Sequence, residues 1–455
     1  MQKILTADGC IVLYPAPPEA PLSREFTVLI NGARVDLYAA PNRYGSTATY
    51  GYCDFSGTIT VSIEVCYSTI ASVQVLPERL HIQPTVEKNS FSFSLEHPEQ
   101  FTVIVDDEYK GSCLHFFANA LEEETIDPED PNVRYFAPGY HTPENGEIVL
   151  TSDQVLYIGG GAFVLARISA QKARNIRILG RGILAQDETC PRNHGIFISD
   201  SENIEISGII ENRRRDGWSG LLLRCSGIQI LDYKVLSPPV WSTDGLNLSG
   251  CSDVLYDHCF FRCGDDNISI KGHGPLGRYD RDADPAQGRS NENIVVQHCQ
   301  FWSDNNNAVV VGQESIAREY RNICFRDCDI LFVRDDEPRK GAMAVICLNG
   351  TQMHGITFED IRIGPCGHLI NIFFTENIFD IPGNQHFPGS IHDITFRNIA
   401  AVGSNTNSIR LRGWSADKII EHVIFDNLTI QGRRIESTDD PHFDMNEFIG
   451  EIQFY

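Results

Sequence analysis

Apolar and polar residues alternate through most of the second half of the chain, with the period of two that a half-buried β-strand gives. Nine segments share one template, in which a polar or glycine residue precedes an alternating run and a second short apolar run. They begin 24 to 40 residues apart. Apolar residues at the three- and four-residue spacing of a helix are nearly absent. The segments are NIRILGRGIL (from Asn175), NIEISGIIEN (Asn203), GIQILDYKVL (Gly227), DVLYDHCFFR (Asp253), NIVVQHCQFW (Asn293), NICFRDCDIL (Asn322), GITFEDIRIG (Gly355), DITFRNIAAV (Asp393) and HVIFDNLTIQ (His422).

A repeat of this length, made only of short strands, predicts a parallel β-helix in which each coil adds a rung and neighbouring rungs bury each other's inner face. The longer intervals indicate loops that leave single coils, and the clearest is the polar stretch 273–290. An ordinary β-sandwich with irregular strand spacing is the alternative. Nine matches to one template favour the β-helix.

The first part of the chain alternates without a shared period and has hairpin-like turns, so residues 1–120 are predicted to form a separate antiparallel β-sandwich. Residues 121–150 are rich in proline and acidic residues and are predicted to be a connector. The β-helix is then expected to occupy 151–455, with its first coil near DQVLYIGGGAFVLA, which starts at Asp153.

The chain of 455 residues has a net charge of −24 and a pI near 4.9, which argues against a nucleic-acid partner and, more weakly, against a polyanionic substrate. No apolar run is long enough for a transmembrane helix, and the first residues lack a secretion signal, so we expect a cytoplasmic protein with no membrane partner. The fourteen cysteines recur inside the repeats and are predicted to be buried thiols. The pairs Cys259/Cys263 and Cys324/Cys328 lack a matching second pair, which argues against zinc.

Three aspartates occupy turns one coil apart: Asp244 in Thr-Asp-Gly, and Asp265 and Asp266 in Gly-Asp-Asp. Alignment by the strand that follows each turn predicts that one column runs up a face of the β-helix at the inter-strand spacing of about 4.8 Å. Its predicted members are His194, Ser219, Asp244, Asp266 and Asn307. Asp244 and Asp266 would then be stacked neighbours, with Asp265 beside them.

Three carboxylates this close repel one another, so at least one is expected to have a raised pKa. Such a cluster suits acid/base hydrolysis of a glycosidic bond, in which one protonated acid donates to the leaving oxygen and ionised partners activate water. Two alternatives stay open. A calcium ion could bind the cluster, or the residues could be solvated turn aspartates.

At these residues the chain resembles glycoside hydrolase family 28, the polygalacturonases, and family 49, the dextranases and isopullulanases. The resemblance rests on STDG and CGDD and covers roughly residues 150–430. It implies an all-β, right-handed parallel β-helix enzyme that inverts configuration. It also implies that Asp265 is the general acid, and that Asp244 and Asp266 position and deprotonate water.

The sequence departs from the pectin-cutting enzymes where they bind galacturonate. Gly-His-Gly lies at 272–274, only six residues after Asp266, and no Arg-Ile-Lys follows. The β-sandwich ahead of the β-helix is more like family 49, whose members cut neutral α-glucans. The resemblance therefore implies a neutral glycan in preference to polygalacturonate.

Several further residues are candidates for substrate contact. Lys271 ends the strand after Asp266, Gln313 and Glu314 lie on the next coil, and His194 lies in the column; Glu314 is also a rival catalytic acid. Trp218 and Trp241, one coil apart, could offer aromatic faces to a sugar or pack internally. Other candidates are Asn305, Asn306 and Asn307 (sugar contacts or an asparagine ladder), Arg213, Arg214 and Arg215 (an anion-binding patch or a solvated face), and His273 in the long loop.

These observations predict an inverting hydrolase of an α-linked oligo- or polysaccharide that needs no cofactor or metal. The oligomeric state stays open. One alternative is a galacturonan hydrolase or a polysaccharide lyase on the same fold. Another is a non-catalytic carbohydrate-binding β-helix.

Overall fold

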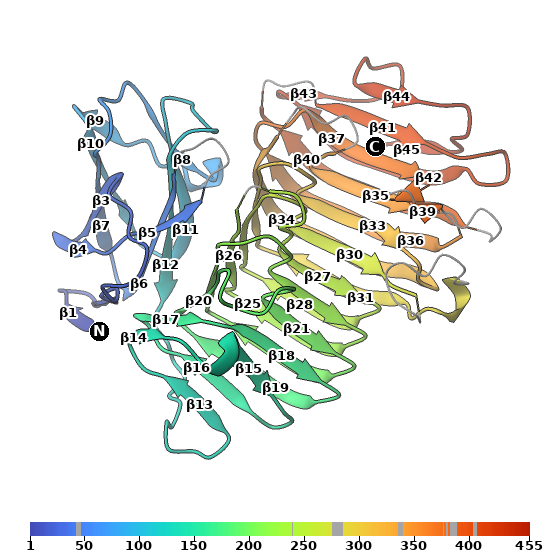
Figure 1. Cartoon of the computed structure of the whole chain (residues 1–455). Coiled ribbons are helices and arrows are strands. Elements are labelled where there is room, and N and C mark those ends of the chain that lie inside the picture. Colours follow the sequence, from blue (N-terminus) through green and yellow to red (C-terminus); the bar gives the residue numbers. More distant parts are fainter. Residues whose placement is uncertain are drawn as a thin grey trace.

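The computed structural model of the chain has two parts, a β-sandwich formed by the N-terminal residues and a long parallel β-helix (Figure 1). The structure describes the whole chain except residues 42–46, 239, 275–284, 335–339, 349, 376, 379–380, 383–388 and 404–406. The all-β fold predicted from the alternating pattern is confirmed. The described helices are the short 3-10 turns η1 (Glu78–Leu80), η2 (Glu144–Gly146) and η3 (Pro285–Gln287).

Two packed sheets make up the N-terminal sandwich. The first contains β1 (Gln2–Leu5), β2 (Cys10–Leu13), β5 (Tyr38–Pro41), β6 (Thr47–Ser56), β8 (Val73–Leu76), β11 (Glu99–Val105) and β12 (Cys113–Ala120); the second contains β3 (Phe26–Ile30), β4 (Ala33–Val35), β7 (Ile59–Val65), β9 (Thr85–Glu87) and β10 (Ser90–Leu95). Neighbouring strands are antiparallel except that β6 and β12 pair in parallel. In β7 the apolar residues at every second position are buried, which is the pattern that predicted the sandwich.

The β-helix is built from parallel strands that pair from one rung to the next. Its larger described sheet contains β13 (Val133–Phe136), β14 (Gly139–His141), β16 (Val155–Ile158), β17 (Ala162–Leu165), β19 (Arg174–Gly180), β20 (Ile183–Gln186), β22 (Glu202–Ser207), β23 (Ile210–Arg213), β25 (Ser226–Leu231), β26 (Lys234–Leu236), β28 (Ser252–Asp257), β29 (Phe260–Cys263), β31 (Asn291–Gln297), β32 (Gln300–Ser303), β34 (Glu319–Val333), β36 (Gln352–Ile363), β40 (Ser390–Ala401), β42 (Ile420–Ile430), β43 (Arg433–Arg434) and β45 (Ile452–Phe454).

The larger sheet forms two sides of the β-helix, and a second sheet forms the third side. It contains β15 (Glu147–Leu150), β18 (Arg167–Gln171), β21 (Ile196–Ser199), β24 (Gly220–Leu223), β27 (Leu246–Ser249), β30 (Ile268–Gly272), β33 (Val309–Ser315), β35 (Met343–Cys347), β37 (His368–Phe374), β41 (Ser408–Arg412) and β44 (Phe443–Met445). The short strands β38 (Asn377–Ile378) and β39 (Ile381–Pro382) pair with each other.

The β-helix begins one rung earlier than the sequence predicts. β13, β14 and β15 lie inside the segment expected to be a connector, and they pair in parallel with β16, β17 and β18. These first strands have three or four residues each and lie among prolines and acidic residues, so they lack the alternation that marks the later repeats.

The nine repeat-opening residues occupy one kind of corner. Each of them has a left-handed backbone with φ between 53° and 65°. Asparagine, aspartate and glycine tolerate this conformation better than other residues, which explains the residue types that recur there. Side chains at the corners also bond along the β-helix: Asn203 Nδ2 donates to Asn175 Oδ1 at 2.9 Å, and Asn322 Nδ2 donates to Asn293 Oδ1 at 2.8 Å.

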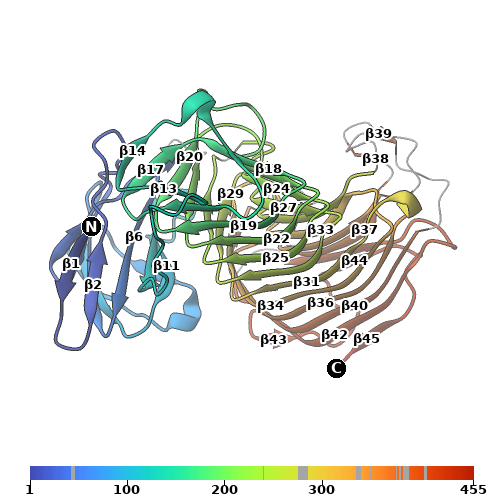
Figure 2. The same cartoon turned by 90° about the horizontal axis from the view of Figure 1, so that it is seen from below.

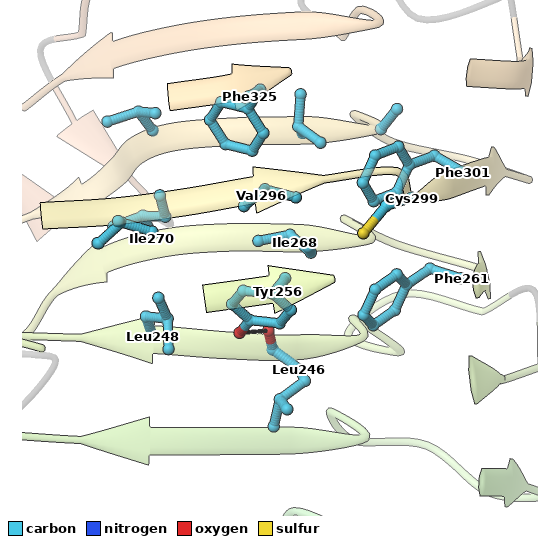
Figure 3. Close-up of a cluster of buried hydrophobic side chains, with 14 of the residues drawn as sticks. Leu246, Leu248, Tyr256, Phe261, Ile268, Ile270, Val296, Cys299, Phe301 and Phe325 are labelled. Carbon is cyan, nitrogen blue, oxygen red and sulfur yellow. Dashed lines mark hydrogen bonds between the residues drawn. The ribbon is translucent and has the colours of Figure 1, made fainter. Parts of the chain in front are cut away.

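The interior of the β-helix is filled from all three sides (Figure 3). Leu246, Leu248, Ile268 and Ile270 come from β27 and β30, and they face Tyr256, Phe261 and Phe301 from the larger sheet. Identical positions of successive rungs stack. The rings of Phe325, Phe358, Phe396, Phe425 and Phe454 form one such stack, with neighbouring centroids 5.0 to 5.4 Å apart.

The sandwich packs against the outer face of the larger β-helix sheet, which Figures 1 and 2 show from two sides. An apolar cluster crosses this boundary and includes Tyr50 and Phe117 from the sandwich and Phe260 and Trp302 from the β-helix. Polar contacts also cross it: Arg79 Nε lies 2.8 Å from Asp329 Oδ2. The two parts therefore share a buried interface.

Twelve of the fourteen cysteines are buried, so the buried thiols predicted from the repeats are confirmed for all except Cys66 and Cys324. Within the described residues, no helix has the length and apolar character needed to cross a bilayer.

Candidate active site

The predicted aspartates lie on turns between the larger sheet and the smaller one. Asp244 is on the turn between β26 and β27, and Asp265 and Asp266 are on the turn between β29 and β30. Gly245 N–H donates to the Asp266 carbonyl at 2.9 Å, so the two turns are hydrogen-bonded. The register pairs Leu248 with Ile270, which places Asp244 opposite Asp266. The predicted neighbourhood of the three carboxylates is therefore present.

The predicted column is correct at His194, Asp244, Asp266 and Asn307, and it is one residue out at Ser219. Ile268 pairs with Val309, so Asn307 continues above Asp266 as predicted. Below Asp244, however, the register pairs Gly220 with Leu246, and Trp218 occupies the column instead of Ser219. The alignment of SGLLL with DGLNL is one residue out because Leu221–Leu223 are three consecutive apolar residues, and a run without alternation does not fix the register.

Asp265 is held by donors on both of its oxygens. Ser242 N–H donates to Oδ2 at 2.7 Å, the Asp266 N–H donates to Oδ1 at 3.1 Å, and Asn306 Nδ2 also donates to Oδ1. Hydrogen bonds of this kind stabilise a charged carboxylate. With 8% of its surface exposed, Asp265 is the most accessible of the three aspartates.

Asp266 and Asp244 are more deeply buried. Asn307 donates to Asp266 Oδ1 twice, through its backbone N–H at 3.2 Å and its Nδ2 at 2.8 Å. Asn247 Nδ2 donates to Asp244 Oδ2 at 2.7 Å. Asn307, a predicted substrate contact, is fully buried and also accepts from Gly341 N–H at 3.0 Å, so in this structure it positions Asp266.

Burial and mutual repulsion raise the pKa values of two of these carboxyls. The pKa of Asp266 rises to about 6, chiefly because of burial and then because of the charge on Asp265. Burial also holds the pKa of Asp244 well above its usual range, against the opposing charge of Lys271. A proton is therefore retained within the cluster near neutral pH, as expected for crowded carboxyls.

Lys271 joins the cluster to the next rung. Its Nζ lies 3.3 Å from Asp244 Oδ2 and 2.8 Å from Glu314 Oε2, and all three residues are buried. Glu314 reaches this position because β33 bulges: the register with β30 shifts by two residues between Ile270 and Gly272. Glu314 is thus the ion-pair partner of Lys271.

Trp218 lies beneath Lys271, with Nζ 4.5 Å from the centre of its ring. The ring is 4% exposed and stacks on His194, with centroids 4.9 Å apart. His273 stacks on it more distantly, at 6.2 Å. The predicted sugar platform is therefore not available at Trp218, because lysine and histidine side chains cover the ring.

Trp241 differs from Trp218, since it is 60% exposed and directly precedes Ser242, the donor to Asp265. Gln313 has a left-handed backbone in the β33 bulge and is half-buried, and its buried Oε1 has no hydrogen-bond partner among the described residues. Both stay candidates for substrate contact. Most of the long loop in which His273 was placed, residues 275–284, lies outside the described residues.

The three arginines of the predicted anion patch do not share one surface. Arg213 is buried and donates to the carbonyls of Asn193 and Asp216, at 2.8 and 2.5 Å. Arg215 is buried too and donates to the Cys190 carbonyl at 2.9 Å. Arg214 alone of the three is exposed, so no three-residue patch exists.

Sequence reasoning missed several residues that shape the site. Asn247 and Asn306 bond the aspartates, but asparagine is common in turns and no pattern distinguished them. Arg262 and Asp304 form a fully buried ion pair with Nε and Oδ2 3.1 Å apart. Arg262 lies at an outward-facing strand position, where charged residues are ordinary, so the local sequence gives no signal for this pair. Glu211 is buried too, and burial raises its pKa to about 8.

In the described part of the chain, no group of three or more histidine, cysteine, aspartate or glutamate side chains has the arrangement to hold a metal ion.

Solved structures with the same architecture include β-helix hydrolases of families 49 and 28. Dex49A from Penicillium minioluteum aligns with 100% of this chain and 99% of its own, with a TM-score of 0.70 and 13% identity. The chain has the fold of the β-helix glycoside hydrolases. A hyperthermoactive exopolygalacturonase from Thermotoga maritima covers 71% of this chain and 83% of its own, with a TM-score of 0.53 and 15% identity.

A polygalacturonase from Erwinia carotovora ssp. carotovora covers 68% of this chain and 85% of its own, with a TM-score of 0.50 and 14% identity. No protein-family model and no curated protein matches the sequence. The predicted resemblance to families 28 and 49 is confirmed as a likeness of fold. At these identities the likeness assigns neither a substrate nor a catalytic residue.

Proposed function

We propose that this protein is an inverting glycoside hydrolase that cleaves an α-glycosidic bond in a neutral oligo- or polysaccharide. One observation carries the proposal: three carboxyls from adjacent rungs meet in one buried cluster, and two of them have raised pKa values. A site that retains a proton beside a negative charge has the two components that general acid and general base catalysis need.

The proton that the leaving oxygen needs comes from the cluster as a unit. The resemblance assigns the acid to Asp265, which accepts hydrogen bonds from three donors in this structure. Burial raises the pKa of Asp266 to about 6 and holds that of Asp244 well above its usual range, so both neighbours of Asp265 take up protons more readily than ordinary aspartates. The ionised members of the cluster position and deprotonate the water that attacks from the far side of the sugar.

Two features support a neutral glycan as the substrate. The chain lacks the residues with which the polygalacturonases are expected to bind galacturonate, and the Arg213–Arg215 segment does not form a cationic patch. Trp241, which directly precedes the Asp265 donor Ser242, has an exposed ring whose apolar face suits a pyranose ring. Dex49A aligns with this chain over its full length.

Aspartate-to-asparagine variants test this proposal. D244N, D265N and D266N are each expected to lower kcat on the order of 10²- to 10⁴-fold on the preferred glycan, with binding kept. The matched control is D253N. Asp253 is an exposed aspartate at a corner of the β-helix, in β28, and its left-handed φ of 57° is one that asparagine tolerates.

The substrate is found by screening neutral α-glucans, galacturonans and fructans, with product anomers followed by NMR. Inverted products from an α-glucan are expected, and retained configuration would contradict the mechanism. An unsaturated product that disappears with chelator would instead indicate a lyase. Binding without turnover, unchanged in D265N, would indicate a non-catalytic binding protein. Aryl glycosides, which need little proton donation, should restore turnover selectively in the variant that lacks the acid.

A further inference from the structure

The N-terminal sandwich contacts the turn that carries the donors to Asp265 and Asp266. The contact runs through Arg262, at the end of β29, whose guanidinium is buried between the sandwich and the β-helix. Its Nε and Nη2 donate to the two oxygens of Asp304 at 3.1 and 3.3 Å. The remaining donor nitrogen, Nη1, points away from the β-helix into the sandwich.

Strand β12 of the sandwich supplies the hydrogen-bond acceptors for Nη1. Nη1 donates to His115 Nε2 at 2.9 Å and lies 2.6 Å from Cys113 Sγ. For His115 Nε2 to accept, the proton must be on Nδ1, and Nδ1 lies 2.8 Å from Thr102 Oγ1. Burial and the charge of Arg262 hold the pKa of His115 well below its ordinary value, so the ring stays neutral and able to accept.

The other end of this chain of contacts is the turn after β32. Asp304 accepts from Trp302 Nε1 at 3.0 Å, and its N–H donates to the Cys263 carbonyl at 2.9 Å. Two and three residues later, Asn306 and Asn307 donate to Asp265 and Asp266. Arg262 is likewise three residues before Asp265, so the Arg262–Asp304 pair links the bases of both turns.

A buried ion pair of this kind depends on every acceptor around it. Loss of the His115 acceptor would leave part of a buried guanidinium unsatisfied, which is costly and favours a shift of the Arg262–Asp304 pair. Such a shift would move the two turns, because Arg262 and Asp304 lie at their bases. A shift of about 1 Å in catalytic groups can lower the rate on the order of 100-fold.

We propose that the N-terminal sandwich fixes the geometry of the carboxyl cluster through His115, Arg262 and Asp304, which act as positioning residues. The proposal rests on the hydrolase function for its rate measurements, but its central claim concerns the placement of Asp265 and Asp266. It gives the sandwich a task in catalysis although no sandwich residue contacts the carboxyl cluster in the described part of the chain.

The test compares three variants of the full chain. H115F removes the acceptor, whereas H115Q keeps one, because the amide oxygen can accept from Arg262 while the amide nitrogen donates to Thr102. The matched control is Y52F, since the Tyr52 hydroxyl accepts from Gly161 N–H at 3.0 Å across the same interface but far from the turns. Melting temperatures are recorded so that rates are compared equally far below each transition.

H115F is expected to lower kcat by about 10- to 100-fold with KM changed less than about twofold, since the change acts on geometry at the reacting centre. H115Q should keep kcat within about threefold, and Y52F should match the wild type. If H115F and Y52F lose kcat equally when each is assayed equally far below its melting temperature, His115 has a merely structural role and the proposal is overturned.

A second readout does not depend on turnover. Carboxyl ¹³C signals of labelled aspartates are followed against pH, with Asp266 assigned from D266N. Its neighbours are Asp265, Asp244, Lys271 and Lys340. In H115F the Asn307 donors loosen, so the Asp266 midpoint should rise above its wild-type value, while Y52F leaves it unchanged.

An unchanged Asp266 midpoint in H115F overturns the inference even if the enzyme is active. A shift in H115F in a chain that hydrolyses no glycan supports the inference and contradicts the proposed function instead. If H115F does not fold, D304N takes its place, because it keeps the shape of the Asp304 contacts and removes their charge. The same rise in midpoint and fall in kcat are then expected, and their absence is decisive.

Discussion

At the scale of single residues, Lys271 is central to the electrostatics of the three carboxyls. Its ammonium group is shared between Asp244 and Glu314. Its charge lowers the pKa values of Asp244 and Asp266, while burial raises them. The position of the acidic limb of activity therefore depends on Lys271.

K271M should move that limb to higher pH. Loss of the ammonium raises the pKa values of Asp244 and Asp266 further, so the ionised forms that activate water appear only at higher pH. The limb, expected near pH 6 in the wild type, is measured from kcat/KM against pH. K271R keeps the charge and should keep the limb, and an unmoved limb in K271M would contradict this account.

Sequence alone predicted that the three aspartates are neighbours, but not the residues that support them. Asp244, Asp265 and Asp266 carry a recognisable spacing, and the one-coil offset sufficed to bring them together. Trp218 was expected to face the substrate, yet the register moves it into the column beneath Lys271. Whether a tryptophan is covered depends on side chains from other rungs, which the local sequence does not contain.

At the scale of elements, the bulge in β33 decides what reaches Lys271. Two additional residues between the rungs turn Gly312 to a φ of +102° and bring Glu314 to the ammonium. The repeat-opening corners were predictable from residue type, because each position needs a left-handed backbone. The bulge was not, since a single Gly-Gln-Glu segment resembles many turns.

G312A should disturb this element strongly. A Cβ at Gly312 would lie 2.0 Å from the Ile346 carbonyl oxygen, on a backbone that L-residues rarely adopt. The expected loss in free energy of unfolding is roughly 1–3 kcal/mol, with lower activity because Glu314 moves from Lys271. Denaturant unfolding and kcat measure the two effects.

The control is G432A, in a turn where φ is +73° and nothing lies within 4 Å of the added Cβ. It should cost only the backbone penalty of about 1 kcal/mol and leave kcat unchanged. Equal effects of the two substitutions would mean that the bulge is not a specific constraint.

At the scale of the whole molecule, the sandwich and the β-helix are one folding unit. The interface buries Trp302, Phe260 and Phe117 together with the Arg262–Asp304 pair. The sequence predicted both parts, because both alternate but only the second follows a repeated template, but it did not predict that they share a core. Interface residues in the repeats look like any other outward-facing apolar position of a strand.

Residues 121–455 expressed alone should therefore not form a stable monomer. Removal of the sandwich exposes a continuous apolar face and a charged pair that the interface had covered. Size-exclusion chromatography with light scattering is expected to show aggregates, and thermal unfolding of the intact chain a single transition. A monomeric, cooperatively folding fragment would contradict the shared core.

The left-handed corners have one more consequence. Because every turn of the coil passes through an equivalent backbone state at the same place, these positions mark seams at which the chain can be cut and rejoined without changing which side chains stack. Duplicating residues 293–321, from one corner to the next, would add one rung to the β-helix. It would also move the C-terminus of the chain away from the turns that carry the three aspartates. The length of the β-helix can thus be changed in whole repeats while the stacking of side chains is kept.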